Sequence, residues 1–216
     1  MARDKAHIRY KTKDNDPVPG ATTILGILNK PALVKWSNNL GLQGISVDKY
    51  VDDKAAIGTL GHALVTDHYA GVTTDTSDYS ANQIDQAQNS ALSFWEWEKG
   101  HPIKRAVLVE TPLVSEIHRF GGTADLYVET QDGALELLDL KTGKGIWPEH
   151  EYQVAAYREL LFEAGHAVDR VRILNIPRSE DEAFVEKVLS EQELETGWKI
   201  FLCCLEIYNL KKGAKK

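Results

Sequence analysis

Apolar residues recur with a helical period in the first half of the chain and with a strand-like period further on. Between residues 22 and 70 they follow helical spacing, with interruptions at Pro31, Gly41 and Gly44. Residues 73–79 are polar and are predicted to form a loop. The next helix is predicted to begin at a capping box and to end near residue 100. A short edge strand is predicted over residues 5–13.

The pattern then changes to short apolar runs bounded by turns. Strands are predicted over residues 106–116, 118–129 and 134–141, as a three-stranded antiparallel meander. A helix over residues 148–163, a strand over 170–177, an edge strand over 183–189 and a final helix from Ser190 to about Leu210 follow. The helix between two strands predicts a βαβ unit with parallel strands. The expected fold is therefore α/β, with a central mixed sheet flanked by helices and an N-terminal helical layer.

We expect one domain, because 216 residues with 43% hydrophobic content can bury a substantial core. Within it, residues 1–104 are expected to be mainly helical and residues 105–210 to form the core around the sheet. Residues 211–216 carry four lysines and are expected to form a solvated basic tail.

Two carboxylates and an amine fall at one place in the predicted meander. In a strand, Asp139 and Lys141 share one face, since side chains alternate. The turn at residues 131–133 would pair their strand with the preceding one and bring Asp125 beside Asp139. Two close carboxylates need a counter-charge, and Mg²⁺ or Mn²⁺ prefers oxygen ligands. Such an ion activates water for hydrolysis of a phosphodiester. Taken alone, an Asp-X-Lys tripeptide is common and indicates only a polar strand end.

The order of three motifs carries a family resemblance. Gly-Gly-Thr-Ala-Asp125, Asp139-Leu-Lys141-Thr-Gly and Gln153-X-X-X-Tyr157 resemble the PD-(D/E)XK nuclease superfamily, specifically its RecB-like branch. The resemblance implies a restriction-endonuclease-like core, Asp125, Asp139 and the Leu140 carbonyl as metal ligands, and Lys141 as the catalytic amine. It also implies that Gln153 and Tyr157 contact DNA or support the site.

The same branch carries a histidine on an upstream helix, where this chain has Gly58-Thr-Leu-Gly61-His62. Apolar neighbours form a helical stripe there, and Gly58 and Gly61 would let the backbone approach another element closely. His62 is therefore expected to face inward. A buried histidine is more often a core residue than a ligand, and the resemblance favours metal binding.

A further resemblance lies over residues 18–25 and 30–36, which look like a segment of phage-encoded RecB-like nucleases and of the mitochondrial genome maintenance exonuclease. Those relatives act preferentially on single-stranded ends, and usually have serine and valine where this chain has Gly20 and Ala21. The segment either packs over the sheet or clamps DNA as an arch.

Four further residues are candidates for the site, and two of them, Glu110 and Trp147, have two readings each. Glu110 is either near the metal, as the family sometimes has it, or on the surface. Trp147 either stacks on a base or packs the loop before the helix. Arg119 and Lys144 lie near the site in sequence and are candidate contacts to DNA. The other tryptophans considered are expected to be core or interface residues, namely Trp36, Trp95 and Trp97.

Composition limits the remaining possibilities. The net charge of −7 argues against a broad phosphate-binding surface, so any nucleic-acid contact must depend on local cations. The only cysteines, Cys203 and Cys204, are adjacent, which excludes an iron–sulfur cluster held by four cysteines. No stretch approaches the length of a membrane span and no signal peptide is evident, so we expect a cytoplasmic protein, in the host cytoplasm if it is phage-encoded.

The sequence therefore predicts a metal-dependent DNA nuclease, an exonuclease on single-stranded or frayed ends, in replication, recombination or repair. One alternative is a catalytically idle nucleic-acid-binding protein that keeps the fold. Another is a site-specific endonuclease, against which the chain shows no separate recognition domain.

Overall fold

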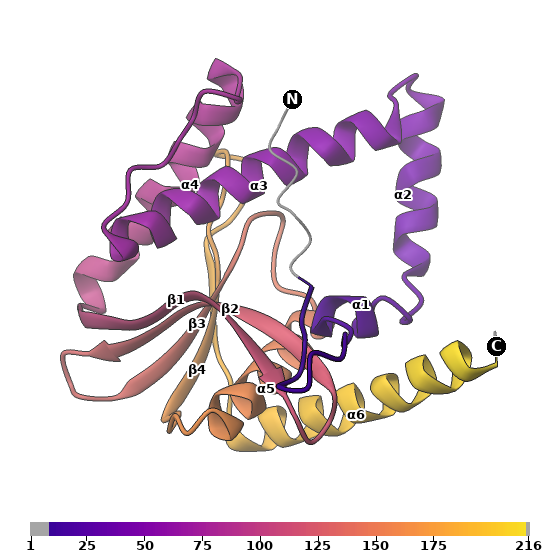
Figure 1. Ribbon diagram of the computed structural model, residues 1–216. Helices are drawn as coiled ribbons and strands as arrows, with labels where there is room; N and C mark the ends of the chain where they lie inside the picture. Colours follow the sequence, from indigo (N-terminus) through magenta and orange to yellow (C-terminus); the bar gives the residue numbers. More distant parts are fainter. Residues whose placement is uncertain (1–8, 215–216) are drawn as a thin grey trace.

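The computed structural model describes residues 9–214, and its centre is one five-stranded sheet, whose place among the helices is seen in Figure 1. The strands follow chain order across the sheet as β1-β2-β3-β4-β5. β3 and β4 are parallel, and the other neighbours are antiparallel. The mixed α/β sheet, the meander and the βαβ unit are thus confirmed. The strands span Ile103–Ser115, Phe120–Thr130, Leu135–Lys141, Arg170–Asn175 and Val185–Val188.

Six helices lie before, between and after these strands within the described residues. Three of them begin at a serine whose side chain accepts a hydrogen bond from the third helical residue, and Ser80 and Ser190 complete capping boxes as the sequence predicted. The helices are α1 (Ala21–Leu25), α2 (Pro31–Leu42), α3 (Val47–Ala70), α4 (Ala81–Gly100), α5 (Pro148–Glu163) and α6 (Glu191–Gly213).

The two faces of the sheet carry different helices, because strand side chains alternate. Leu137 and Ile173 pack with α1, α5 and α6, whereas Leu138 and Leu174 pack with α4 and with Val65 of α3. Figure 1 shows the same division, with α3 and α4 on one side of the sheet and α5 and α6 on the other. The sheet is therefore buried on both faces.

Helix α2 differs from the others because none of its residues is buried. It links α1 to α3 and stands apart from the sheet in Figure 1. Leu33 and Val34 are exposed on it. The side chain of Lys30, just before α2, forms an ion pair of 2.6 Å with Glu149 in the first turn of α5. This contact connects the start of α2 to the body of the molecule.

Three expectations about local structure need correction. Residues 1–8 lie outside the described part, and the rest of the proposed first strand forms only an isolated bridge between Lys11 and Pro17. Gly41 lies within α2 and does not interrupt it. Lys211 and Lys212 continue α6 rather than starting a tail, and basic side chains in a last helical turn complement the helix dipole.

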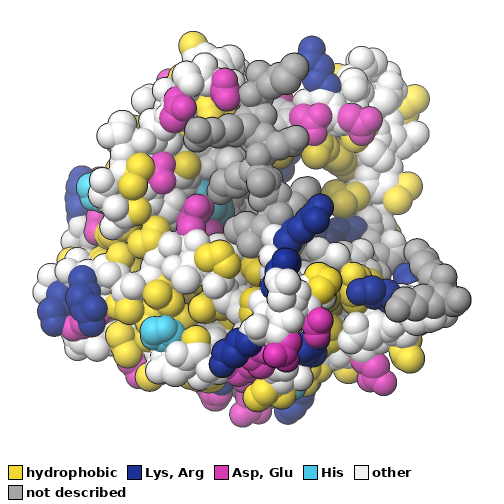
Figure 2. Space-filling view, in the orientation of Figure 1, with side chains coloured by type: hydrophobic (Ala, Val, Ile, Leu, Met, Phe, Trp, Pro, Cys, Tyr) yellow, Lys and Arg dark blue, Asp and Glu magenta, His cyan; other side chains and the backbone are white. Residues whose placement is uncertain are grey.

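Charge and hydropathy over the described residues add two observations. None of the helices there is both long and apolar enough to cross a membrane. On the face shown in Figure 2, basic and acidic side chains are interspersed and do not form one basic band.

Candidate active site

The pairing between β2 and β3 ends where the predicted carboxylates lie. The last residue pair is Leu126 with Leu138, one step before Asp125 and Asp139. Beyond it, the backbone N–H of Leu140 donates to Oδ2 of Asp125 at 2.8 Å, so a side chain takes over where the strand ladder stops. Asp125 is therefore fixed against the end of β3. The predicted proximity of the two strand segments is confirmed.

Asp139 and Lys141 form the second part of the site. They share a face of β3, and Nζ of Lys141 lies 2.5 Å from Oδ2 of Asp139. The carboxyl of Asp139 is almost wholly buried, and burial together with the charge of Asp125 raises its pKa to about 6 despite the nearby ammonium group. Asp139 is thus a buried carboxylate whose negative charge is only partly compensated.

His62 approaches this pair from α3. Its Nδ1 lies 3.5 Å from Oδ1 of Asp125. Burial alone would raise the pKa of Asp125, but the charges of His62 and Lys141 and the hydrogen bond from Leu140 lower it overall. The expected inward orientation of His62 is confirmed.

Gly58 holds α3 close to the site. A Cβ at this position would lie 2.6 Å from Oγ1 of Thr142, the residue after Lys141. A side chain there would push α3 away and carry His62 with it. The close approach predicted for Gly58 and Gly61 is confirmed, since a Cβ on Gly61 would also meet Ser90 at 3.3 Å.

Gln153 and Tyr157 lie on one face of α5, as their spacing predicted. Nε2 of Gln153 donates to the hydroxyl of Tyr157 at 2.7 Å. Burial and then the charges of Asp139 and Asp125 raise the pKa of Tyr157, so its hydroxyl is within electrostatic range of both carboxylates. A Cβ on Gly122 would lie 2.4 Å from that ring, so the second glycine of the Gly-Gly-Thr-Ala-Asp motif makes room for Tyr157.

The first glycine of the motif accommodates Tyr10, a residue that the sequence did not single out. A Cβ on Gly121 would lie 2.2 Å from Cγ of Tyr10, and the Tyr10 hydroxyl hydrogen-bonds Oγ1 of Thr123 at 2.9 Å. The backbone N–H of Gly121 also donates to the Pro19 carbonyl at 2.9 Å. The N-terminal segment therefore braces the strand that carries Asp125, although no periodic signal in it indicates this.

The donor atoms at this site fit a hard divalent cation in part. Oδ2 of Asp139 is buried and, among the described residues, receives no hydrogen bond of suitable direction. Carboxylate and carbonyl oxygens suit Mg²⁺ or Mn²⁺, which commonly bind through one or two carboxylates and retain several waters. Over residues 9–214, no three His, Cys, Asp or Glu side chains are arranged closely enough to hold an ion by themselves. Water and substrate oxygens would have to complete the coordination.

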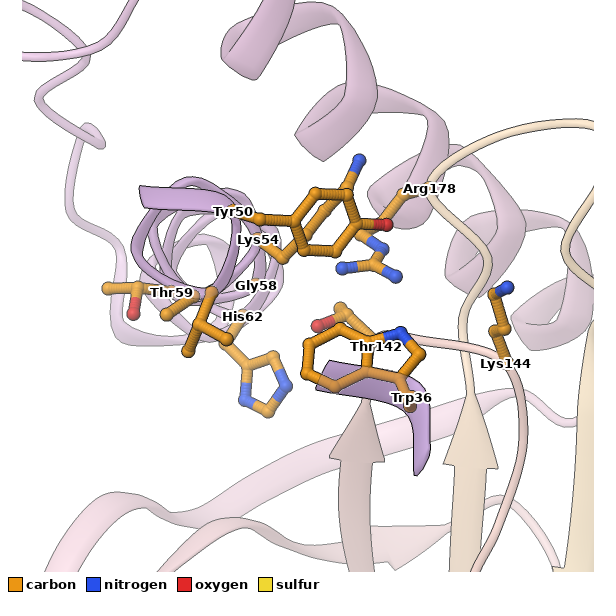
Figure 3. Close-up of a pocket in the computed structure, with 11 residues that line it drawn as sticks. Trp36, Tyr50, Lys54, Gly58, Thr59, His62, Thr142, Lys144 and Arg178 are labelled. Atoms are coloured by element: carbon orange, nitrogen blue, oxygen red, sulfur yellow. The ribbon is translucent and has the colours of Figure 1, made fainter. Parts of the chain in front are cut away.

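A cavity of about 550 Å³ adjoins these residues (Figure 3). His62 and Thr142 belong to its wall, which connects it to the carboxylate site. Lys144, predicted as a DNA contact, also lines it. The other residues of the wall are Trp36, Tyr50, Val51, Lys54, Ala55, Gly58, Thr59 and Arg178.

The remaining predicted residues do not line this cavity. Arg119 pairs with Asp16 at 2.7 Å and lies six residues before Asp125, roughly 20 Å along an extended strand. Trp147 is exposed at the start of α5. Glu110 has a φ of 40° and lines a separate cavity of about 210 Å³ with Asp67 and Asp78.

Several cavity residues escaped the sequence analysis, although signals for them exist. Tyr50, Lys54, Gly58 and His62 recur every four residues and therefore share one face of α3. Arg178 follows β4, and the carboxyl ends of parallel strands meet at one edge of a sheet. The backbone confirms this, because the N–H of Ile176 donates to the Lys141 carbonyl at 2.8 Å.

The chain is similar to one family model and to several solved structures. Residues 35–212, most of the chain, match the family model described as the PD-(D/E)XK nuclease superfamily. Among solved structures, a protein from Eubacterium rectale described as a candidate exonuclease is similar over 73% of this chain and 68% of its own, with 12% identity and a TM-score of 0.47. LHK-Exo, solved in complex with dAMP, is similar over 73% of this chain and 85% of its own, with 15% identity and a TM-score of 0.34. No curated protein matched by sequence.

Proposed function

The chain belongs to the PD-(D/E)XK nuclease superfamily, and on that premise we propose that it is a divalent-metal-dependent DNA nuclease. The observation that carries the proposal is the convergence of Asp125, Asp139 and Lys141 where β2 and β3 part. Two carboxylates there would provide the charge that a cation needs, and the amine of Lys141 lies 2.5 Å from one of them. His62 adds an imidazole from α3.

Each residue has a definite role in this proposal. Asp125 and Asp139 would hold Mg²⁺ or Mn²⁺ with the Leu140 carbonyl, and His62 would add a ligand or orient Asp125. The bound ion supplies an activated water and neutralises charge on the phosphate. Lys141 forms an ion pair with Asp139, which compensates part of its charge. Once freed from that carboxylate, its ammonium group orients the attacking water or stabilises the pentacoordinate phosphorus.

Tyr157 and Gln153 support the site from the side of α5. Their mutual hydrogen bond fixes the Tyr157 hydroxyl, and burial keeps this hydroxyl protonated, since its pKa is raised. A protonated hydroxyl retains its hydrogen and does not add a third negative charge beside Asp125 and Asp139. Their role is positioning, because neither residue carries charge to the reacting phosphate.

We propose further that the enzyme is an exonuclease acting on single-stranded or frayed DNA ends. The cavity beside the carboxylates supports this, because it is small and its lining combines cations with aromatic rings. Stacking rings next to cations suit unpaired nucleotides better than an intact duplex. On the face shown in Figure 2, the interspersed charges form no broad basic band along which a long duplex would lie.

The test is a cleavage assay with end-labelled linear single-stranded DNA, linear duplex and closed circular single strands. Each substrate is incubated with Mg²⁺, Mn²⁺ or EDTA. We expect shortening of linear single strands with either metal and none with EDTA. Rapid cutting of closed circles would show an endonuclease. Binding without cleavage of any substrate would favour a catalytically idle protein.

Matched variants test the site itself. Asp125→Asn and Lys141→Gln are each expected to reduce cleavage by roughly 100-fold or more, since several kcal/mol of transition-state stabilisation depend on the ion and on the amine. Asp132→Asn in the exposed β2–β3 turn and Lys99→Gln at the end of α4 are the controls, and both should cleave normally. Full activity in Asp125→Asn or Lys141→Gln would refute the assignment.

A further inference from the structure

The cavity next to the carboxylates has an aromatic side and a basic side. Trp36 and Tyr50 provide the aromatic side, with ring centroids 5.9 Å apart and ring planes at 66°. Because the rings meet edge to face, the edge of one ring covers only part of one face of the other, and the remaining flat surfaces are free of this ring contact. In Figure 3 both rings and the Arg178 side chain face the same space. The arrangement leaves ring surface turned into the cavity.

Helix α2, which has no buried residue, places Trp36 in the wall of the cavity. Although α2 has no buried residue, Trp36 is half-buried, whereas Leu33 and Val34 on the same helix are exposed. Its ring contact is with Tyr50 of α3 and not with the sheet core. The expectation that Trp36 is a core or interface residue therefore holds only in the sense that it joins α2 to α3. Its position is that of a wall of the cavity.

The basic side consists of three cations on separate elements. Arg178 is paired with Glu182, to which its Nε donates at 3.0 Å. Lys54 donates instead to the neutral amide oxygen of Gln86 at 2.9 Å, and Lys144 is exposed at the mouth. Among the described residues that line the cavity there is no carboxylate. The charges of Lys54 and Lys144 act on Asp181 and that of Lys54 also on Glu182, but neither carboxylate lines the cavity, so both lysines present positive charge to an anionic ligand there.

We propose that this cavity is a subsite for one unpaired nucleotide next to the scissile phosphate, a step that rests on the proposed nuclease function. The base stacks on one of the two rings and meets the other edge to face, since the ring planes differ by 66°, and its phosphate lies against Lys54 and Lys144. A volume of about 550 Å³ is within the range of small-ligand sites, which is roughly 300–1,000 Å³. The location follows from His62 and Thr142, which belong both to the cavity wall and to the surroundings of the carboxylates.

The subsite gives a physical reason for preferring unpaired ends. A base within a duplex is already stacked on both faces, so it would have to leave the helix before it could contact Trp36. That step costs a few kcal/mol for a paired base and little for a single strand. Selection of the end therefore resides in the ring pair, whereas hydrolysis resides in Asp125, Asp139 and Lys141.

The experiment measures binding in EDTA, where metal-dependent cleavage is blocked. Fluorescence anisotropy gives the affinity for an oligothymidylate and for an oligomer of equal length with abasic sites throughout. Wild type should prefer the oligothymidylate. Trp36→Ala and Tyr50→Ala should each weaken its binding by about five-fold or more, the value of one base–aromatic stack, and leave binding of the abasic oligomer unchanged.

Leu33→Ala is the matched control, because it removes an exposed apolar side chain from α2 without touching the cavity. Its preference for the oligothymidylate should equal that of wild type. Trp36→Phe keeps a ring and should retain part of the preference, which separates stacking from a folding defect. Circular dichroism verifies that each variant is folded.

Lys54→Gln tests the basic side through salt dependence. One lost phosphate contact should reduce the slope of log affinity against log salt by about 0.7 for a single strand. Lys49→Gln, exposed on α3 and outside the cavity, should leave the slope unchanged. An unchanged slope in Lys54→Gln would overturn its assignment as a phosphate contact.

The outcomes separate this inference from the nuclease proposal. If wild type cleaves DNA but Trp36→Ala and Tyr50→Ala bind the oligothymidylate as tightly as Leu33→Ala, the subsite is refuted and the nuclease stands. If the wild-type protein cleaves no substrate, but Trp36→Ala and Tyr50→Ala lose the preference for the oligothymidylate that wild type shows, the subsite stands and the enzyme proposal fails.

Discussion

Glu136 and Asp139 are two buried carboxylates three residues apart on β3, and they differ in how many cationic partners surround them. Glu136 lies on the face covered by α4 and accepts hydrogen bonds from Arg170 at 3.0 Å and Arg172 at 2.5 Å. Arg172 also contacts Glu186 and lies 5.3 Å from the Trp97 ring centroid. Asp139, on the other face, has a single ammonium group as its cationic neighbour on β3 and a second carboxylate close by.

The difference teaches how to distinguish a structural charge from a functional one. Burying a carboxylate is costly unless it is paired and hydrogen-bonded. Glu136 has two guanidinium partners, so its charge is compensated by the protein itself. Burial and the charge of Asp125 raise the pKa of Asp139 to about 6, so its negative charge lacks full compensation within the chain. A divalent cation would supply it.

The largest expected effect is the loss of stability in Glu136→Gln. The change leaves Arg170 and Arg172 without a buried counter-charge, and breaking a buried pair in this way costs about 3–5 kcal/mol of unfolding free energy. Urea denaturation of wild type and variant measures the difference. At temperatures where the variant is folded, its cleavage rate should be normal. Unchanged stability would mean that the network around Glu136 is dispensable.

Asp139→Asn should show the reverse pattern. Cleavage should fall by roughly 100- to 1,000-fold, because a metal ligand is lost. Unfolding free energy measured in EDTA should equal or exceed that of wild type, since a buried charge beside Asp125 is removed. If Asp139→Asn were instead as unstable as Glu136→Gln, the contrast between the two carboxylates would disappear and Asp139 would be a structural ion pair.

Gly122→Ala tests how closely the site depends on packing. The added Cβ would lie 2.4 Å from the Tyr157 ring, so the ring must shift, at a cost of about 1–3 kcal/mol. Cleavage should fall as well, because Tyr157 lies beside the carboxylates. Gly41→Ala is the control, since nothing lies within 4 Å of its Cβ and helical alanine is favoured by about 0.5–1 kcal/mol. Equal stability of the two variants would refute this account of Gly122.

Tyr157→Phe and Tyr127→Phe form the most subtle comparison. Both hydroxyls are hydrogen-bonded, that of Tyr157 to Gln153 and that of Tyr127 to the Ala167 carbonyl. Each loss should cost about 1 kcal/mol in thermal or urea unfolding. Only Tyr157→Phe should also slow cleavage, because only its hydroxyl adjoins the carboxylates. Equal activity of the two variants would limit Tyr157 to a structural role.

Much of the fold was predictable because its signals are local. The capping boxes at Ser80 and Ser190 and the helix from Pro148 to Glu163 appear in the structure where the sequence places them. The βαβ unit follows from the order of its elements. The prediction of a first strand over residues 5–13 was wrong in its described part, since Lys11 forms only an isolated bridge. A single run of alternating residues does not specify whether another strand lies beside it.

For the site as well, the sequence predicted the features that depend on local geometry. Because side chains alternate along a strand, Asp139 and Lys141 share one face of β3. Because Gln153 and Tyr157 are one helical turn apart, they share one face of α5. These relations depend only on backbone geometry within a few residues. The roles of Asp125, Asp139, Lys141 and His62 in binding metal stay predictions, which the proposed variants test.

The sequence by itself thus determined the elements, their order and the motif-bearing residues, because propensity, capping and alternation act over a few positions. Only the tertiary structure decided that Tyr10 packs on Gly121, that the β2–β3 ladder stops at Asp125, and that Trp36 and Lys54 enclose one cavity. These contacts join residues far apart in the chain. They depend on how helices pack around the sheet, which no local pattern encodes.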